Sequence, residues 1–220
     1  MRLVLPRLYV ILDAALLTLP ETQLAASLAE AGVRLLQYRN KRASARELLE
    51  KSRPLAEGLL PRQVHFIVND RADVAALAGA GGVHVGQDDL GADAARGIVG
   101  PEAVVGVSTH NLEQFAAAAQ TSADYIALGP IFATDTKANP DPVVGLEMIR
   151  AARRLTNKPI VAIGGITLER VAEVIAAGAD SVAVISDILR APDPAKRARA
   201  FIELLEGANH AAPCEAKRNG

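Results

Sequence analysis

The chain has 220 residues, which is enough for one domain with a substantial core. Its 24 lysines and arginines balance 25 aspartates and glutamates, and only 3% of its residues are aromatic, which argues against a nucleic-acid binder. A single cysteine, Cys214, excludes a disulfide framework. Pro6, Arg7 and Asp13 interrupt the apolar start, and no apolar run reaches the length of a membrane span, so we expect a cytoplasmic protein without membrane partners.

Short apolar runs alternate with longer segments of helical periodicity along the whole chain. The runs rich in Val, Ile and Leu predict strands at residues 8–12, 35–39, 65–69, 82–86, 104–108, 125–129, 159–163 and 181–185. The segments between and after them predict helices at residues 21–31, 44–60, 71–78, 92–99, 112–120, 146–154, 168–176 and 194–206. Thr167 is predicted to cap the seventh helix, and Gly178 is predicted to follow its end.

Eight strands alternating with eight helices in this length predict an α/β fold, a single (β/α)₈ TIM barrel over residues 1–207. The continuous apolar runs are typical of parallel strands covered on both faces. A doubly wound open sheet is the alternative, but it would normally carry a glycine fingerprint where this chain has Asp13-Ala14-Ala15. Residues 208–220 are expected to form a disordered tail.

Two cationic residues, Arg39 and Lys41, lie at the end of the second predicted strand. Alternation along Gln37-Tyr38-Arg39-Asn40-Lys41 points Gln37, Arg39 and Lys41 the same way. Two cations beside an amide suit an anion with several oxygens, such as a diphosphate. A solvated strand end is the alternative.

Carboxylates follow the next two strands, at Asp70 and at the pair Asp88 and Asp89. Carboxylates beside a cationic phosphate site are the usual way to hold Mg²⁺, which takes its remaining ligands from phosphate and water. Asp70 could instead cap the helix that begins at the next residue. The spacing alone does not decide between Asp88 and Asp89.

Histidines lie near the same strands. His65 and His84 fall inside predicted strands, where a histidine is more often a hydrogen-bonded core residue than a catalyst. His110 follows the fifth strand and is better placed for function, although it could simply begin the next helix.

The loops after the last three strands suit phosphate. Residues 129–137 form a long connection with two hydroxyls and a lysine, which favours a lid that closes over phosphate, with a solvated loop as the alternative. Gly164-Gly165-Ile166 and Ile185-Ser186-Asp187 follow the strands whose loops bind phosphate in many barrels. Two anion sites predict two phosphorylated substrates or one bisphosphate.

Seven segments, in order along the chain, resemble thiamine-phosphate synthases. They are Gln37-Tyr38-Arg39-Asn40-Lys41, Phe66-Ile67-Val68-Asn69-Asp70-Arg71, Gly82-Val83-His84-Val85-Gly86-Gln87-Asp88-Asp89, Gly106-Val107-Ser108-Thr109-His110, Gly129-Pro130-Ile131-Phe132-Ala133-Thr134-Asp135-Thr136-Lys137, Ile163-Gly164-Gly165-Ile166 and Val184-Ile185-Ser186. The resemblance implies a TIM-barrel transferase that condenses a hydroxymethylpyrimidine diphosphate with a thiazole phosphate and releases pyrophosphate. Ala133 departs from the family pattern, which often has proline there.

The resemblance also implies the role of each matching residue. It implies that Asp70 and Asp89 bind one Mg²⁺ per subunit, which favours Asp89 over Asp88. The residues it assigns to the pyrimidine diphosphate are Gln37, Arg39 and Lys41, assisted by Asn69, Ser108 and Lys137; of these, Arg39, Lys41, Ser108 and Lys137 are predicted to be catalytic. Those it assigns to the thiazole phosphate are Thr134, Thr136, Gly165, Ile185 and Ser186. Three more matching residues, Tyr38, Asn40 and Asp135, are predicted to bind substrate, with no choice made between the two substrates.

Diphosphate departure needs charge neutralisation rather than a protein nucleophile, which agrees with the absence of an obvious nucleophile–base pair in the sequence. The alternatives are a thiazole tautomerase on the same scaffold, a sugar-phosphate isomerase and a non-catalytic phosphate-binding barrel. The combination of Lys41, Asp70, Asp89 and Lys137 favours the transferase, because an isomerase binds neither diphosphate nor Mg²⁺. A homo-oligomer is left open.

Overall fold

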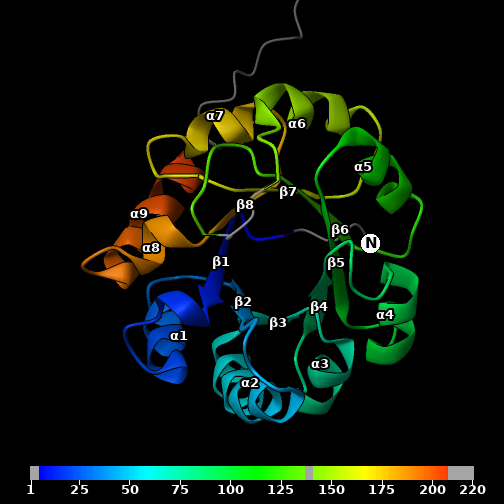
Figure 1. Ribbon diagram of the computed structural model, residues 1–220. Coiled ribbons are helices and arrows are strands. Elements are labelled where there is room, and N and C mark those ends of the chain that lie inside the picture. The colour runs from blue at the N-terminus through cyan, green and yellow to red at the C-terminus, as the bar shows by residue number, and fades with distance from the viewer. Residues whose placement is uncertain (1–4, 137–140, 208–220) are drawn as a thin grey trace, which may run out of the picture.

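A computed structural model describes residues 5–136 and 141–207, and its strands close into one barrel (Figure 1). The strands are parallel and follow one another in chain order around the barrel, with β8 pairing back to β1. They are Leu8–Asp13 (β1), Leu35–Arg39 (β2), His65–Asn69 (β3), Gly82–Val85 (β4), Val104–Thr109 (β5), Tyr125–Leu128 (β6), Ile160–Ile163 (β7) and Ser181–Val184 (β8). The predicted TIM barrel is confirmed.

Helices follow the strands and surround the barrel (Figure 1). The α-helices are Glu21–Glu30 (α1), Ala45–Leu59 (α2), Ala72–Ala78 (α3), Ala92–Val99 (α4), Leu112–Ala119 (α5), Gly145–Arg153 (α6), Val171–Ala176 (α7), Ser186–Leu189 (α8) and Pro194–Gly207 (α9). Short 3₁₀ helices cover Ala14–Leu16 (η1) and Leu60–Arg62 (η2). The sequence did not predict η1, η2 or α8. Within the described residues no helix is both long and apolar enough to cross a membrane.

The ends of the helices show which local signals were informative. Ser44 and Glu47 form a reciprocal capping box at the start of α2, where Glu47 accepts from the Ser44 N–H at 2.8 Å. Gly178 follows α7 at φ +113°, as predicted for a helix stop. The predicted cap at Thr167 is wrong. Residues 167–170 form a turn, in which the Thr167 carbonyl accepts from the Arg170 N–H at 3.1 Å. Helix α7 begins after this turn, at Val171, so Arg170 and not Thr167 occupies the N-cap position.

The barrel has two apolar layers, because successive side chains of each strand point to opposite faces. Val10 and Leu12 face the helices in the larger layer, whereas Tyr9 and Ile11 fill the barrel interior. The interior is therefore a packed hydrophobic core. Gln37 is the register partner of Ile11, so its buried side chain also faces the barrel interior.

Candidate active site

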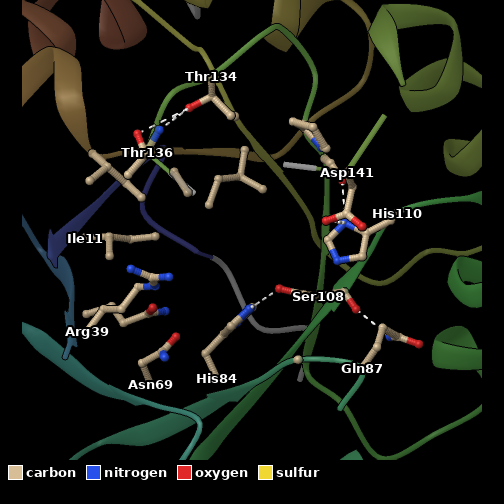
Figure 2. Close-up of a pocket in the computed structure, with 18 of the residues that line it drawn as sticks. Ile11, Arg39, Asn69, His84, Gln87, Ser108, His110, Thr134, Thr136 and Asp141 are labelled. Carbon is tan, nitrogen blue, oxygen red and sulfur yellow. Dashed lines mark hydrogen bonds and ion pairs between the residues drawn. The ribbon is translucent and has the colours of Figure 1, made fainter. Parts of the chain in front are cut away.

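A cavity of about 520 Å³ lies at the mouth formed by the carboxyl ends of the strands. Side chains from strands far apart in sequence point into it (Figure 2). Its lining includes Gln37, Arg39, Lys41, Asn69, Asp70, His84, Gln87, Asp88, Asp89, Ser108, His110, Thr134, Thr136, Asp141, Gly165, Ile185 and Ser186. Most residues that the sequence predicted for the site therefore share one cavity.

The two cations at and just beyond the end of β2 are paired with carboxylates. Asp13, buried at the end of β1, forms an ion pair with Arg39, its register partner on β2, and also accepts from the Ala15 N–H at 3.0 Å. The Lys41 ammonium lies 2.5 Å from a carboxylate oxygen of Asp70. Both cations are thereby fixed at the rim of the cavity. Asp13 was not predicted for the site, although its place at the end of an apolar strand was a usable signal.

Asp70 and Asp89 lie beside each other at the ends of β3 and β4. Burial raises the pKa of Asp70, the neighbouring Asp89 carboxylate raises it further, and Lys41 opposes both effects. Asp70 has φ +64°, a conformation rare for residues other than glycine. Helix α3 begins at Ala72 without a side-chain cap, so the alternative of Asp70 as a helix cap is wrong. Asp89 accepts from the Gly86 N–H at 2.8 Å.

Hydrogen bonds also fix the histidines at the mouth. The Nε2 of His84 lies 2.8 Å from the Ser108 hydroxyl (Figure 2). His84 is buried and hydrogen-bonded as expected, yet it also lines the cavity. Nδ1 of His110 lies 2.7 Å from the Gly129 carbonyl oxygen and 3.4 Å from a carboxylate oxygen of Asp141, a residue that was not predicted for the site. His65 is exposed at the start of β3, so the expectation of a core residue is wrong there.

The opposite side of the cavity is built from hydroxyls and glycine. The hydroxyls of Thr134 and Thr136 lie 3.2 Å apart (Figure 2). Gly165 has φ +64°, and a Cβ added there would lie 2.9 Å from Cβ of Phe132. Only glycine lets these loops approach so closely. Ser186, at the start of α8, lines the same side.

Some predicted residues lie elsewhere. The Tyr38 side chain is buried in the outer layer, with its hydroxyl 3.3 Å from Glu21, because alternation turns it away from the cavity. The side-chain Oδ1 of Asn40 accepts from the backbone N–H groups of Arg42 and Ala43, which follow it in the loop. Asp135 is ion-paired with Arg190 at 2.8 Å on an adjoining surface hollow. Lys137 lies outside the described residues.

Gln87 was not predicted for the site, yet it lines the cavity and donates to the Ser108 carbonyl at 2.6 Å (Figure 2). Its position in the quoted segment beside Asp88 was the available signal. Taken together, the barrel mouth joins cations, adjacent carboxylates and a glycine-bordered loop in one cavity. This combination defines a TIM-barrel enzyme that acts on phosphorylated small molecules.

Comparisons with known proteins identify the particular family. The family model described as "Thiamine monophosphate synthase" matches residues 8–188. A thiamine-phosphate synthase of Koribacter versatilis is 56% identical over 91% of this chain and 96% of that protein. A thiamine-phosphate synthase of Agrobacterium fabrum is 43% identical over 92% of this chain and 94% of that protein. A solved thiamine phosphate pyrophosphorylase from Pyrococcus furiosus has a TM-score of 0.83 at 34% identity, covering 92% of this chain and 96% of that one.

The chain belongs to the thiamine monophosphate synthase family. The function predicted from the sequence, a transferase of thiamine biosynthesis with small-molecule substrates, is confirmed.

Proposed function

We propose that this protein joins a hydroxymethylpyrimidine diphosphate to a thiazole phosphate at the barrel mouth, with one Mg²⁺ held by Asp70 and Asp89. The observation that carries this proposal is the contiguous arrangement of Lys41, Asp70 and Asp89, in which an ammonium and two carboxylates meet at one rim of the cavity. Such a rim suits a diphosphate together with its metal ion.

The residues fit a magnesium ion. The carboxylates of Asp70 and Asp89 are adjacent, and the raised pKa of Asp70 reflects burial next to a second negative group, which a cation would relieve. Two carboxylates leave most of the octahedral positions for phosphate oxygens and water, as Mg²⁺ prefers. When bound, Mg²⁺ would neutralise charge on the departing diphosphate.

Around the metal site, Arg39, Lys41 and Asn69 would bind the diphosphate, with Gln37 and Ser108 on the interior side contacting the pyrimidine end. Asp13 keeps the Arg39 guanidinium at the rim, so this cation is already in position before substrate arrives. Lys137, the remaining cation of the predicted set, follows the lid threonines in sequence and would add charge from the loop.

The thiazole phosphate would occupy the opposite side of the cavity, where Thr134, Thr136 and Ser186 supply hydroxyls and Gly165 leaves its backbone accessible. Ile185, just before α8, would line this side with its apolar side chain. Asp135 holds Arg190 at the edge of the adjoining hollow and would contribute to the phosphate end through that cation.

The reaction balances without a protein nucleophile. The bond between the pyrimidine methylene carbon and the diphosphate oxygen breaks, and its electron pair leaves with pyrophosphate. The thiazole nitrogen then supplies the electron pair of the new carbon–nitrogen bond. The protein's contribution is to hold both reactants in line and to stabilise the charge that develops on the leaving group.

Pyrophosphate release from the purified protein, with each substrate omitted in turn and with Mg²⁺ present or chelated, tests this proposal. We expect release only when both substrates and the metal are present. Release without Mg²⁺ would exclude the metal role. If the folded protein releases no pyrophosphate but converts one thiazole carboxylate phosphate isomer into another, the tautomerase alternative would replace the synthase.

Single-charge variants test the metal ligands. Asp70→Asn and Asp89→Asn are each expected to lower Mg²⁺-dependent turnover by at least about 100-fold, as the loss of one electrostatic stabiliser does in other active sites. Asp88→Asn is the matched control, because Asp88 is the neighbouring carboxylate that the proposal leaves without a metal role. Equal losses in Asp88→Asn and Asp89→Asn would contradict the assignment, and unfolding midpoints establish that all variants fold.

A further inference from the structure

A chain of hydrogen-bonded side chains crosses the barrel interior beneath the cavity. It runs from Gln37 on β2 through Tyr9 and Tyr125 to His84 and ends at Ser108 on β5. The successive distances are 2.6, 3.0, 2.9 and 2.8 Å. Its two ends, Gln37 and Ser108, line the cavity, whereas the two tyrosines lie below it.

We propose that this chain holds His84 in the form protonated at Nε2, and that His84 thereby makes the Ser108 hydroxyl a hydrogen-bond donor to the pyrimidine substrate. His84 is in this view a positioning residue, which acts on the ligand through Ser108. The inference adds to the proposed function and rests on it for the identity of the ligand.

The direction of the chain follows from its first member. The Gln37 amide nitrogen can only donate, so the Tyr9 oxygen accepts from it. Among the described residues, Tyr125 is the other hydrogen-bond partner of the Tyr9 hydroxyl, so the Tyr9 proton is satisfied only by donation to Tyr125. The Tyr125 proton is then directed to Nδ1 of His84. A ring nitrogen that accepts carries no proton, so a neutral imidazole is protonated at Nε2.

The far end of the chain faces the cavity. Nε2–H of His84 donates to the Ser108 oxygen, which leaves the Ser108 proton available for an acceptor on the ligand. A doubly protonated imidazole would instead leave the Tyr125 proton without this acceptor in a buried site, which is unfavourable. Burial raises the pKa of Tyr9 and Tyr125 above the ordinary tyrosine range, so both phenols keep their protons.

A glycine in the barrel wall leaves room for the Tyr125 ring to reach His84 across β5. Gly106 on β5 is the register partner of both His84 on β4 and Tyr125 on β6. With no side chain between them, the Tyr125 ring reaches across and stacks on His84, with centroids 5.5 Å apart and planes at 22°. A Cβ on Gly106 would lie 2.5 Å from Cε1 of Tyr125. The rings of Tyr9 and Tyr125 meet edge to face, with centroids 5.9 Å apart.

The tautomer of His84 is measurable without substrate, by two-bond proton–nitrogen NMR correlation on protein labelled at its histidines, with His84→Gln to assign the signal. We expect a protonated Nε2 and an unprotonated Nδ1 at neutral pH. A ring protonated at Nδ1, or at both nitrogens, would overturn the inference. Because no substrate is involved, this result is independent of whether the proposed reaction occurs.

Phenol removal tests the chain at points outside the cavity. Tyr125→Phe deletes the donor to His84, so we expect a mixture of His84 tautomers and a fall in kcat of about five- to tenfold, the range that one lost hydrogen bond gives. KM for the thiazole phosphate should stay within about twofold, because that end of the cavity is untouched. Tyr9→Phe leaves the Tyr125 donor in place and should have the same effects to a smaller degree.

Thr109→Val is the matched control. Thr109 carries a buried hydroxyl on the same strand as Ser108, but it donates to the Ala127 carbonyl and takes no part in the chain. We expect the His84 signals and kcat to be unchanged in Thr109→Val. If the His84 tautomer is unchanged in Tyr125→Phe, or if Thr109→Val loses as much kcat as Tyr125→Phe, the proposal is wrong. The hydrogen-bonded side chains would then serve only to pack the barrel core.

Discussion

Gly106→Ala inserts one methyl group at the point where the Tyr125 ring passes over β5. The new Cβ would lie 2.5 Å from Cε1 of Tyr125 and closer still to Cζ and the phenolic oxygen, whereas carbon atoms normally pack at about 3.5–4.0 Å. The ring is fully buried, so it can move only by displacing its neighbours in the barrel interior. Overpacking of this kind costs about 1–3 kcal/mol.

Two smaller effects adjust that figure. Replacing a strand glycine recovers about 0.5–1 kcal/mol of backbone entropy. A displaced Tyr125 also loses its hydrogen bond to His84, worth about 1 kcal/mol. We therefore expect a net loss of about 2 kcal/mol, which lowers Tm by about 4–8 °C in a domain of this size. The same variant should redistribute the His84 tautomers and lower kcat.

Thermal and urea unfolding measure this loss. Gly97→Ala is the control, since an added Cβ there meets no atom within 4 Å and Gly97 lies inside helix α4. That variant should gain about 1 kcal/mol from helix propensity. Combining Gly106→Ala with Tyr125→Leu should cost less than the sum of the two single changes, because the shortened side chain frees the space. A Gly106→Ala protein as stable as the wild type would refute the packing argument.

Three further variants address single contacts. Asp13→Asn removes the buried partner of Arg39 and should lower the free energy of unfolding by about 2 kcal/mol, seen by urea denaturation, while raising KM for the pyrimidine diphosphate. Ser44→Ala breaks the capping box of α2 and should cost about 1 kcal/mol in the same assay. The pKa of Glu169 is lowered to about 2, and the largest cause is the hydrogen bond from the Thr167 hydroxyl. Any stability that this carboxylate contributes is therefore present above the ordinary glutamate pKa and is lost as the pH falls toward 2. Thr167→Val should raise the pKa of Glu169, as measured by an NMR titration.

The sequence by itself determined the barrel and most of the rim. Apolar runs of strand length separated by helical periodicity define a parallel sheet covered by helices, and the carboxyl ends of such strands meet at one face. Asp70 and Asp89 could therefore be expected at one mouth before their contact was seen. Tyr38 was predicted to bind substrate together with its neighbours, whereas the structure places its side chain in the outer layer, as the alternation of side chains along β2 requires.

Only the tertiary structure decided which side chains meet across the barrel. Tyr9 and Tyr125 are 116 residues apart, and their contact depends on the register of several strands and on the missing side chain of Gly106. The pairing of Asp13 with Arg39 likewise depends on the β1–β2 register. Periodicity describes one strand at a time, so it gives the face on which a side chain lies. It cannot give the partner on that face, because the partner is chosen when the barrel closes.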